Sequence, residues 1–204
     1  ENKAYLKYGY LIIEYLSKKY PGEVYYISSD INDNVSDLNV VNIYIGKGFL
    51  LQYFFKSVVT DNLFMTLTDL NNNIIKKNKA VKNYIYFFHG AVSTTRIYTS
   101  TAFDNYDTIL CNGDYQIKEI KQREELGNLK EKKLIKSGFF YFDYLKAKID
   151  EVNVNNEILV APSWNKNRLN FINEDFEEIL ANLLNSGHKV RFRPHPETVK
   201  RSRN

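Results

Sequence analysis

The sequence predicts an α/β fold made of two units, each built around a parallel sheet. Short apolar runs of strand length alternate along the chain with stretches of helical character. The runs are continuously apolar rather than alternating with polar residues, which is typical of strands covered by helices on both faces. The polar segment at residues 153–156 divides this series, so we expect a first unit over residues 1–152 and an incomplete second unit over residues 153–204.

The first unit is expected to be Rossmann-like. An amphipathic, tyrosine-rich helix over residues 5–20 opens it, and docking of this helix onto the sheet is favoured over docking onto a membrane surface. Strands are expected at residues 25–27, 42–45, 63–67, 84–88, 108–111 and 134–136, and further helices at residues 49–58, 114–126 and 142–149.

A second series of strand, helix and strand follows the polar segment. We expect strands at residues 157–161 and 189–193 and a helix at residues 174–185, where apolar residues recur at helical spacing. No helix is expected after the last strand, so the chain is expected to be part of a longer protein. Two Rossmann-like units joined by a linker describe a GT-B arrangement.

Composition excludes several classes of function. The net charge of +4 is mild and the basic residues are spread without a nucleic-acid motif, so no nucleic-acid partner is expected. No apolar run is long enough to cross a bilayer. Closely spaced His, Cys or Asp ligands are missing from the sequence, so no metal and no other cofactor is expected. The one cysteine, Cys111, lies in an apolar run, which favours a buried strand thiol over a nucleophile and agrees with a cytoplasmic location.

Two of the three histidines follow expected strands. Ligands bind beyond the carboxyl ends of the strands in open parallel sheets, which is where His89 and His195 are expected. Imidazole titrates near neutrality and can therefore exchange a proton or carry positive charge beside a phosphate. For His89 two interpretations have equal weight: a structural role, in which the imidazole is hydrogen-bonded to a loop carbonyl, and a functional role. Gly90 strengthens the functional interpretation, because glycine admits close approach of a ligand or a backbone conformation closed to other residues.

Other residues near these strand ends suit an anionic ligand. Ser93 and Thr94 offer hydroxyls and amides to phosphate oxygens, although a helix cap or turn is the stronger interpretation. Arg193, beside His195, suits a diphosphate. The turn Gly46-Lys47-Gly48 is interpreted as a tight connection between strand and helix, with a substrate-facing loop as the alternative.

Five segments of the chain resemble, in order and spacing, the CDP-glycerol glycerophosphotransferase family of bacterial teichoic acid and capsule polymerases and primases. The matching segments are Phe88-His89-Gly90-Ala91-Val92-Ser93-Thr94, residues 102–111, residues 137–145, Ile158-Leu159-Val160-Ala161-Pro162-Ser163-Trp164 and Phe192-Arg193-Pro194-His195-Pro196. The resemblance covers the chain from about residue 80 onwards.

The resemblance implies a GT-B fold and a transfer without metal, in which an acceptor hydroxyl attacks the β-phosphate of CDP-glycerol and CMP leaves. By this likeness His89 is the general base, and His195 with Arg193 binds the donor diphosphate. Ser163 and Trp164 would line the cleft between the units. The acceptor would be a membrane-anchored polymer, so peripheral association with the inner face of the plasma membrane is expected.

Two other functions stay open at this point. The same arrangement suits a nucleotide-sugar glycosyltransferase or epimerase, since fold alone does not fix function. A non-catalytic domain of a larger capsule polymerase, with structural histidines, is the third hypothesis.

Overall fold

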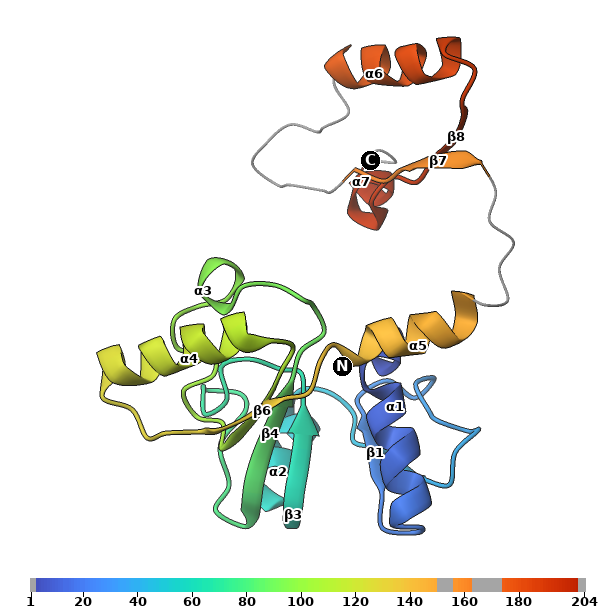
Figure 1. Ribbon diagram of the computed structural model, residues 1–204. Coiled ribbons are helices and arrows are strands. Elements are labelled where there is room, and N and C mark those ends of the chain that lie inside the picture. The colour runs from blue at the N-terminus through green and yellow to red at the C-terminus, as the bar shows by residue number, and fades with distance from the viewer. Residues whose placement is uncertain (1–2, 150–155, 163–173, 202–204) are drawn as a thin grey trace. The chain divides into compact units, whose positions relative to one another are not determined.

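The computed structural model describes residues 3–149, 156–162 and 174–201 of the chain. It divides into two compact units, residues 1–150 and 151–204, shown in Figure 1. The predicted boundary between residues 152 and 153 lies outside the described residues. Both units are α/β, and every strand pair in the described residues is parallel, as the sequence predicts.

The first unit contains each strand and helix expected from its sequence. In chain order its elements are α1 (Lys3–Lys19), β1 (Tyr25–Ser28), β2 (Val41–Tyr44), α2 (Phe49–Ser57), β3 (Thr60–Met65), β4 (Val81–Phe87), α3 (Thr94–Ile97), β5 (Thr108–Cys111), α4 (Asp114–Gly127), β6 (Lys133–Lys136) and α5 (Phe140–Ile149). The single turn α3 is the one element of this unit that the sequence did not predict.

The strands of the first unit form two hydrogen-bonded groups rather than one sheet. β3, β4, β5 and β6 pair side by side in that order, while β1 pairs with β2. The register places Tyr84 opposite Leu63 and Tyr86 opposite Ile109. The four-stranded sheet is thus ordered as its strands follow one another in the sequence.

Strands β4 and β5 contribute fully buried residues to the core of the first unit. Tyr84, Tyr86 and Ile109 have no exposed surface, and the ring of Tyr86 packs edge-on against Phe88 at a centroid distance of 4.9 Å. Burial of each such side chain contributes about 1.5–3 kcal/mol, so these two strands supply much of the stability of the unit. Cys111 is also fully buried in β5, which confirms the predicted strand thiol; burial raises its pKa to about 12.

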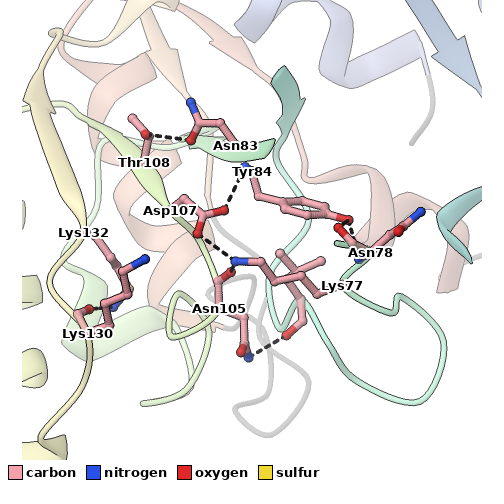
Figure 2. Close-up of polar contacts among 10 residues, drawn as sticks. Lys77, Asn78, Asn83, Tyr84, Asn105, Asp107, Thr108, Lys130 and Lys132 are labelled. Atoms are coloured by element: carbon pink, nitrogen blue, oxygen red, sulfur yellow. Dashed lines mark hydrogen bonds and ion pairs between the residues drawn. The ribbon is translucent and has the colours of Figure 1, made fainter. Parts of the chain in front are cut away.

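A network of hydrogen bonds with one ion pair holds the amino-terminal end of β5 in position, as Figure 2 shows. Asp107 accepts a hydrogen bond from Lys77 Nζ at 2.8 Å through one carboxylate oxygen and from the Tyr84 N–H at 3.0 Å through the other. Lys77 also donates to the Asn105 carbonyl at 2.8 Å, and the Asn78 N–H donates to the Tyr84 hydroxyl at 2.8 Å. The loop between β3 and β4 is therefore tied to the start of β5.

The second unit is a strand–helix–strand unit with a short final helix. Its elements are β7 (Glu157–Val160), α6 (Glu174–Asn185), β8 (Lys189–Phe192) and α7 (Pro196–Arg201). Phe176 of α6 is buried and packs against Phe192 of β8, with ring centroids 5.3 Å apart. The expectation that no helix follows the last strand is wrong, because α7 begins at Pro196. Proline suits this first helical position, since its missing N–H has no intrahelical partner there.

Helix length and polarity bear on membrane insertion. Within the described parts of the chain, none of the helices combines the length and apolar character needed to span a bilayer.

Candidate functional site

A cavity of about 510 Å³ opens in the first unit beyond the carboxyl ends of its strands. Its described lining consists of Tyr5, Ser29, Asp30, Lys47, Thr66, Leu67, Thr68, His89 and Tyr98. This volume lies within the range of small-molecule sites, and the lining mixes aromatic side chains with a few polar groups. The first unit therefore has a ligand-sized opening where parallel sheets usually bind ligands.

Both groups of strands contribute to this cavity. Ser29 and Asp30 directly follow β1, and Lys47 lies in the turn between β2 and α2. Thr66 to Thr68 follow β3, and His89 lies two residues after the last residue of β4. The carboxyl ends of β1, β2, β3 and β4 thus meet at one opening, although the two groups are hydrogen-bonded separately.

His89 is half-buried in the wall of the cavity, against helix α1. The ring of Tyr5 meets the imidazole edge-on, with centroids 5.1 Å apart, and Tyr8 lies at 6.1 Å. Gly9 permits this arrangement, because a Cβ at that position would come within 2.9 Å of the Phe87 ring at the end of β4. A small residue in α1 therefore brings two tyrosines against the imidazole.

Lys47 projects from a turn that requires glycine on both sides. Gly46 has a φ of 69° and Gly48 a φ of 62°, which is the left-handed region that side chains disfavour. The predicted tight turn is thus confirmed, and the same turn lines the cavity. The Lys47 side chain is exposed and has no ion-pair partner within the part of the chain that the structure describes.

Asp30 is held in place by the loop that follows β1. Its Oδ1 accepts a hydrogen bond from the Asn32 N–H at 3.0 Å, and its own N–H donates to Ser28 Oγ at 3.1 Å. Ser28 Oγ in turn donates to the buried Asp33 carboxylate at 2.9 Å, which also accepts from the Tyr26 hydroxyl. The half-buried Asp30 carboxylate therefore has a defined position in the cavity wall.

The hydroxyls of Ser93 and Thr94, for which phosphate binding was the weaker interpretation, bind a carboxylate from α4. Ser93 Oγ donates to Glu119 Oε1 at 2.8 Å, and the Thr94 hydroxyl and N–H both donate to Glu119 Oε2 at 2.6 Å. This arrangement fits the turn interpretation of Ser93 and Thr94. Burial acts to raise the pKa of Glu119, but these hydrogen bonds and one from the Thr95 N–H outweigh it and lower the pKa below its ordinary value.

Gly90 does not use the conformational freedom of glycine. It lacks the positive φ that five other described glycines adopt, and a Cβ there would meet only the Val92 methyls, at 3.8 Å. Its carbonyl accepts a hydrogen bond from Asn112 Nδ2 at 3.0 Å. The backbone therefore gives no support to the conformational reason for this glycine, and close approach of a ligand to Gly90 stays a prediction.

His195 and Arg193 lie at the carboxyl end of β8 in the second unit, and both are exposed. The Arg193 N–H donates to the Val160 carbonyl at 2.9 Å, extending the pairing with β7. The His195 carbonyl accepts from the N–H groups of Thr198 and Val199 and so begins α7. Ser163 and Trp164 lie outside the described residues. A shared cleft for His89 and His195 stays a prediction.

Comparisons of the chain with models of known protein families, with curated proteins and with solved structures find no match in any of the three. The chemistry of the cavity is therefore inferred from its own side chains.

The sequence reasoning did not identify Asp30, Thr66, Thr68 or Tyr5 as cavity residues. The signal for Asp30 and Thr68 was present, because each follows a predicted strand, and the same rule had selected His89. Thr66 was placed inside a strand over residues 63–67, but β3 ends at Met65. No pattern in α1 marks Tyr5, whose position depends on how the helix packs.

Proposed function

We propose that this chain is a transferase that moves a glycerol-phosphate or related polyol-phosphate group from a CDP-activated donor to a hydroxyl of a wall or capsule polymer. The observation that carries the proposal is the position of His89, in a ligand-sized cavity at the carboxyl ends of β1 to β4. The resemblance of the His89 and His195 segments to CDP-glycerol glycerophosphotransferases supports the choice of donor.

In the proposed reaction His89 accepts the proton of the acceptor hydroxyl. The oxygen forms a bond to the β-phosphorus of the donor, the bond between that phosphorus and the bridging oxygen breaks, and CMP leaves with the electron pair. Such proton transfer contributes typically 10²–10⁴-fold to a rate. Arg193 and His195 would neutralise charge on the diphosphate, and this placement of cations is the larger part of catalysis in phosphoryl transfer.

This chemistry assigns different substrates to the two units. The first unit would bind the acceptor and the second the nucleotide donor, in a GT-B arrangement. An acceptor anchored in a membrane would bring the enzyme to the inner face of the plasma membrane as a peripheral protein.

The leaving nucleotide tests the proposal. The protein is incubated with a panel of CDP-activated polyols and of nucleotide-activated sugars, together with a polyol-phosphate acceptor, and the released nucleotide is identified by chromatography. Release of CMP, dependent on the acceptor, is the expected result. Release of a nucleoside diphosphate would instead support a glycosyltransferase. Absence of both turnover and nucleotide binding would support a non-catalytic domain.

A further inference from the structure

We propose that the exposed edge of β2 pairs with the same strand of a second copy of this chain, in a two-fold symmetric dimer with an antiparallel contact between the two strands. This inference goes beyond the proposed function and does not depend on it. The partner is identified by the chemistry of the edge, which presents backbone donors and acceptors beside uncharged, mostly apolar side chains. Two-fold dimers are also the commonest assemblies of identical subunits.

The backbone of β2 leaves one side of the strand unpaired. The N–H groups of Val41 and Ile45 donate to carbonyls on the β1 side, at 2.9 and 3.0 Å. Alternate residues of a strand bond to the same neighbour, so the N–H and C=O groups of Asn42 and Tyr44 point away from β1. Within the described residues β2 pairs with β1 alone, and all of its residues are exposed. The Asn42 side chain is bonded to the Val35 backbone at 2.8 Å, so the strand is held in place while its edge stays exposed.

β2 lacks the charges that protect other edges. Edge strands usually carry charged residues or proline, which oppose pairing with another chain. β3, β6, β7 and β8 also lie at sheet edges and each contains at least one charged residue, whereas β2 contains neither a charge nor a proline. The uncharged stretch extends over residues 38–46. β1, the remaining edge strand, is half-buried or buried after its first residue. The edge of β2 is therefore the one suited to pairing.

Antiparallel pairing about Ile43 satisfies the outward-pointing groups. With the two-fold axis beside Ile43, Asn42 of one copy stands opposite Tyr44 of the other, and each such pair exchanges both of its N–H···O bonds. The two Ile43 residues then face each other as a non-hydrogen-bonded pair, with Cα atoms about 4.5 Å apart. A shift of one residue would place these groups opposite groups that are already bonded to β1. The pattern of free backbone groups thus selects a register.

The apolar surface beside this edge is large enough for a specific contact. The exposed large apolar residues of β2 and of the first turns of α2 are Val41, Ile43, Tyr44, Phe49, Leu50 and Tyr53. Strand and helix adjoin here, because a Cβ at Gly46 would come within 2.9 Å of the Leu50 side chain. At about 150–250 Å² for a whole aromatic side chain, exposed fractions between 38% and 75% amount to roughly 600 Å² in each copy. Covering this surface in both copies gives about 1,200 Å², the lower limit for specific interfaces.

Cysteine crosslinking of the whole chain tests the register. Ile43→Cys should form a disulfide between two copies when diamide is the oxidant, because Cα atoms about 4.5 Å apart lie within disulfide range. The native Cys111 is fully buried, so the wild type should not crosslink. Val59→Cys is the matched control, because Val59 is 78% exposed and lies outside β2, and it should not crosslink either. Non-reducing gel electrophoresis measures the covalent dimer.

Sedimentation equilibrium measures the association without a crosslink. We expect the wild-type chain to dimerise with a dissociation constant of about 10 μM or less. Ile43→Lys should raise this constant about tenfold or more, because it removes apolar contact and places like charges directly opposite each other. Val59→Lys should keep the wild-type value. Circular dichroism of each variant establishes that it is folded.

A wild-type chain that stays monomeric at about 100 μM would overturn the inference and leave the proposed transferase in place. A dissociation constant of Ile43→Lys within twofold of the wild type would also overturn it, because the contact would then lie elsewhere. Equal crosslinking of Ile43→Cys and Val59→Cys would do the same, since random collision would explain both.

Discussion

Glu119 illustrates how one carboxylate on α4 fixes the loop that follows His89. It accepts hydrogen bonds from the Ser93 hydroxyl, the Thr94 hydroxyl and the Thr94 N–H, at 2.6–2.8 Å. Because these bonds favour the charged carboxylate, the pKa of Glu119 is lowered even though burial opposes the shift. The loop between β4 and α3 is therefore held from the side of α4.

Replacement of Glu119 by Gln should destabilise the protein by about 1–2 kcal/mol at neutral pH, because charged acceptors form the stronger hydrogen bonds. A lowered pKa means that the contribution of Glu119 is present above the ordinary glutamate pKa and is lost as the pH falls through the folded-state value. The difference in unfolding free energy between wild type and variant should therefore shrink in acid. Urea titrations at several pH values measure it. Glu125→Gln, at an exposed position of the same helix, should show neither effect.

The positions of some residues could be predicted from the sequence, and those of others could not. His89 and His195 were placed after strands correctly. For His89 the signal was the buried apolar run that precedes it, whereas β8, before His195, contains Lys189 and Arg191 and is largely exposed. It was not predictable that Lys47 and Asp30 line the same cavity as His89. Their place in the same cavity depends on how β1 and β2 lie beside β3 and β4, to which they are not hydrogen-bonded.

At the scale of elements, β5 is anchored both by core packing and by polar contacts at its start. The segment over residues 102–111 contributes ion pairs to the fold: Asp104 pairs with Arg123 at 2.6 Å, and Asp107 pairs with Lys77 at 2.8 Å. The continuous apolar run of β5 predicted this strand with its observed limits. The helix α7 was not predicted from the sequence, although proline is favoured at the first position of a helix, which Pro196 occupies.

Removal of the Asp107 carboxylate should destabilise the sheet. Asp107→Ala leaves the Tyr84 N–H and the half-buried Lys77 amine without this acceptor, so we expect a loss of about 2–3 kcal/mol in unfolding free energy. Asp61→Ala is the control, because its ion pair with Lys82 is largely exposed and such pairs contribute about 0–1 kcal/mol. Chemical denaturation of both variants compares them. Equal losses would contradict a structural role for the network in Figure 2.

At the scale of the whole molecule, the two units differ in how much apolar surface they bury. The largest buried cluster of the described residues lies in the first unit, around Tyr84, Tyr86 and Ile109. In the second unit Phe176 is buried, whereas Leu159 and Leu184 remain more than half exposed. The division into two units was expected from the polar segment in the sequence. The difference in how well the two units are packed became visible only from the positions of the side chains.

Hydrogen–deuterium exchange should report this inequality. Amides of β4 and β5 are expected to exchange most slowly, with protection close to the global unfolding free energy, because they lie in the densest core. Amides of β7 and β8 should exchange at least tenfold faster, since few apolar contacts oppose local opening. Mass spectrometry of peptic fragments resolves the two sets. Slower exchange in β7 and β8 than in β4 and β5 would contradict the packing described here.

The central claim is that His89 takes the acceptor proton in the cavity of the first unit. Acceptor-dependent CMP release by His89→Ala, measured beside the wild type, tests it most directly. We expect the rate to fall by about 10²–10⁴-fold, the usual contribution of a general base, with an unchanged circular dichroism spectrum. His188→Ala, at an exposed position before β8, should release CMP at the wild-type rate. A rate for His89→Ala within twofold of the wild type would contradict the claim.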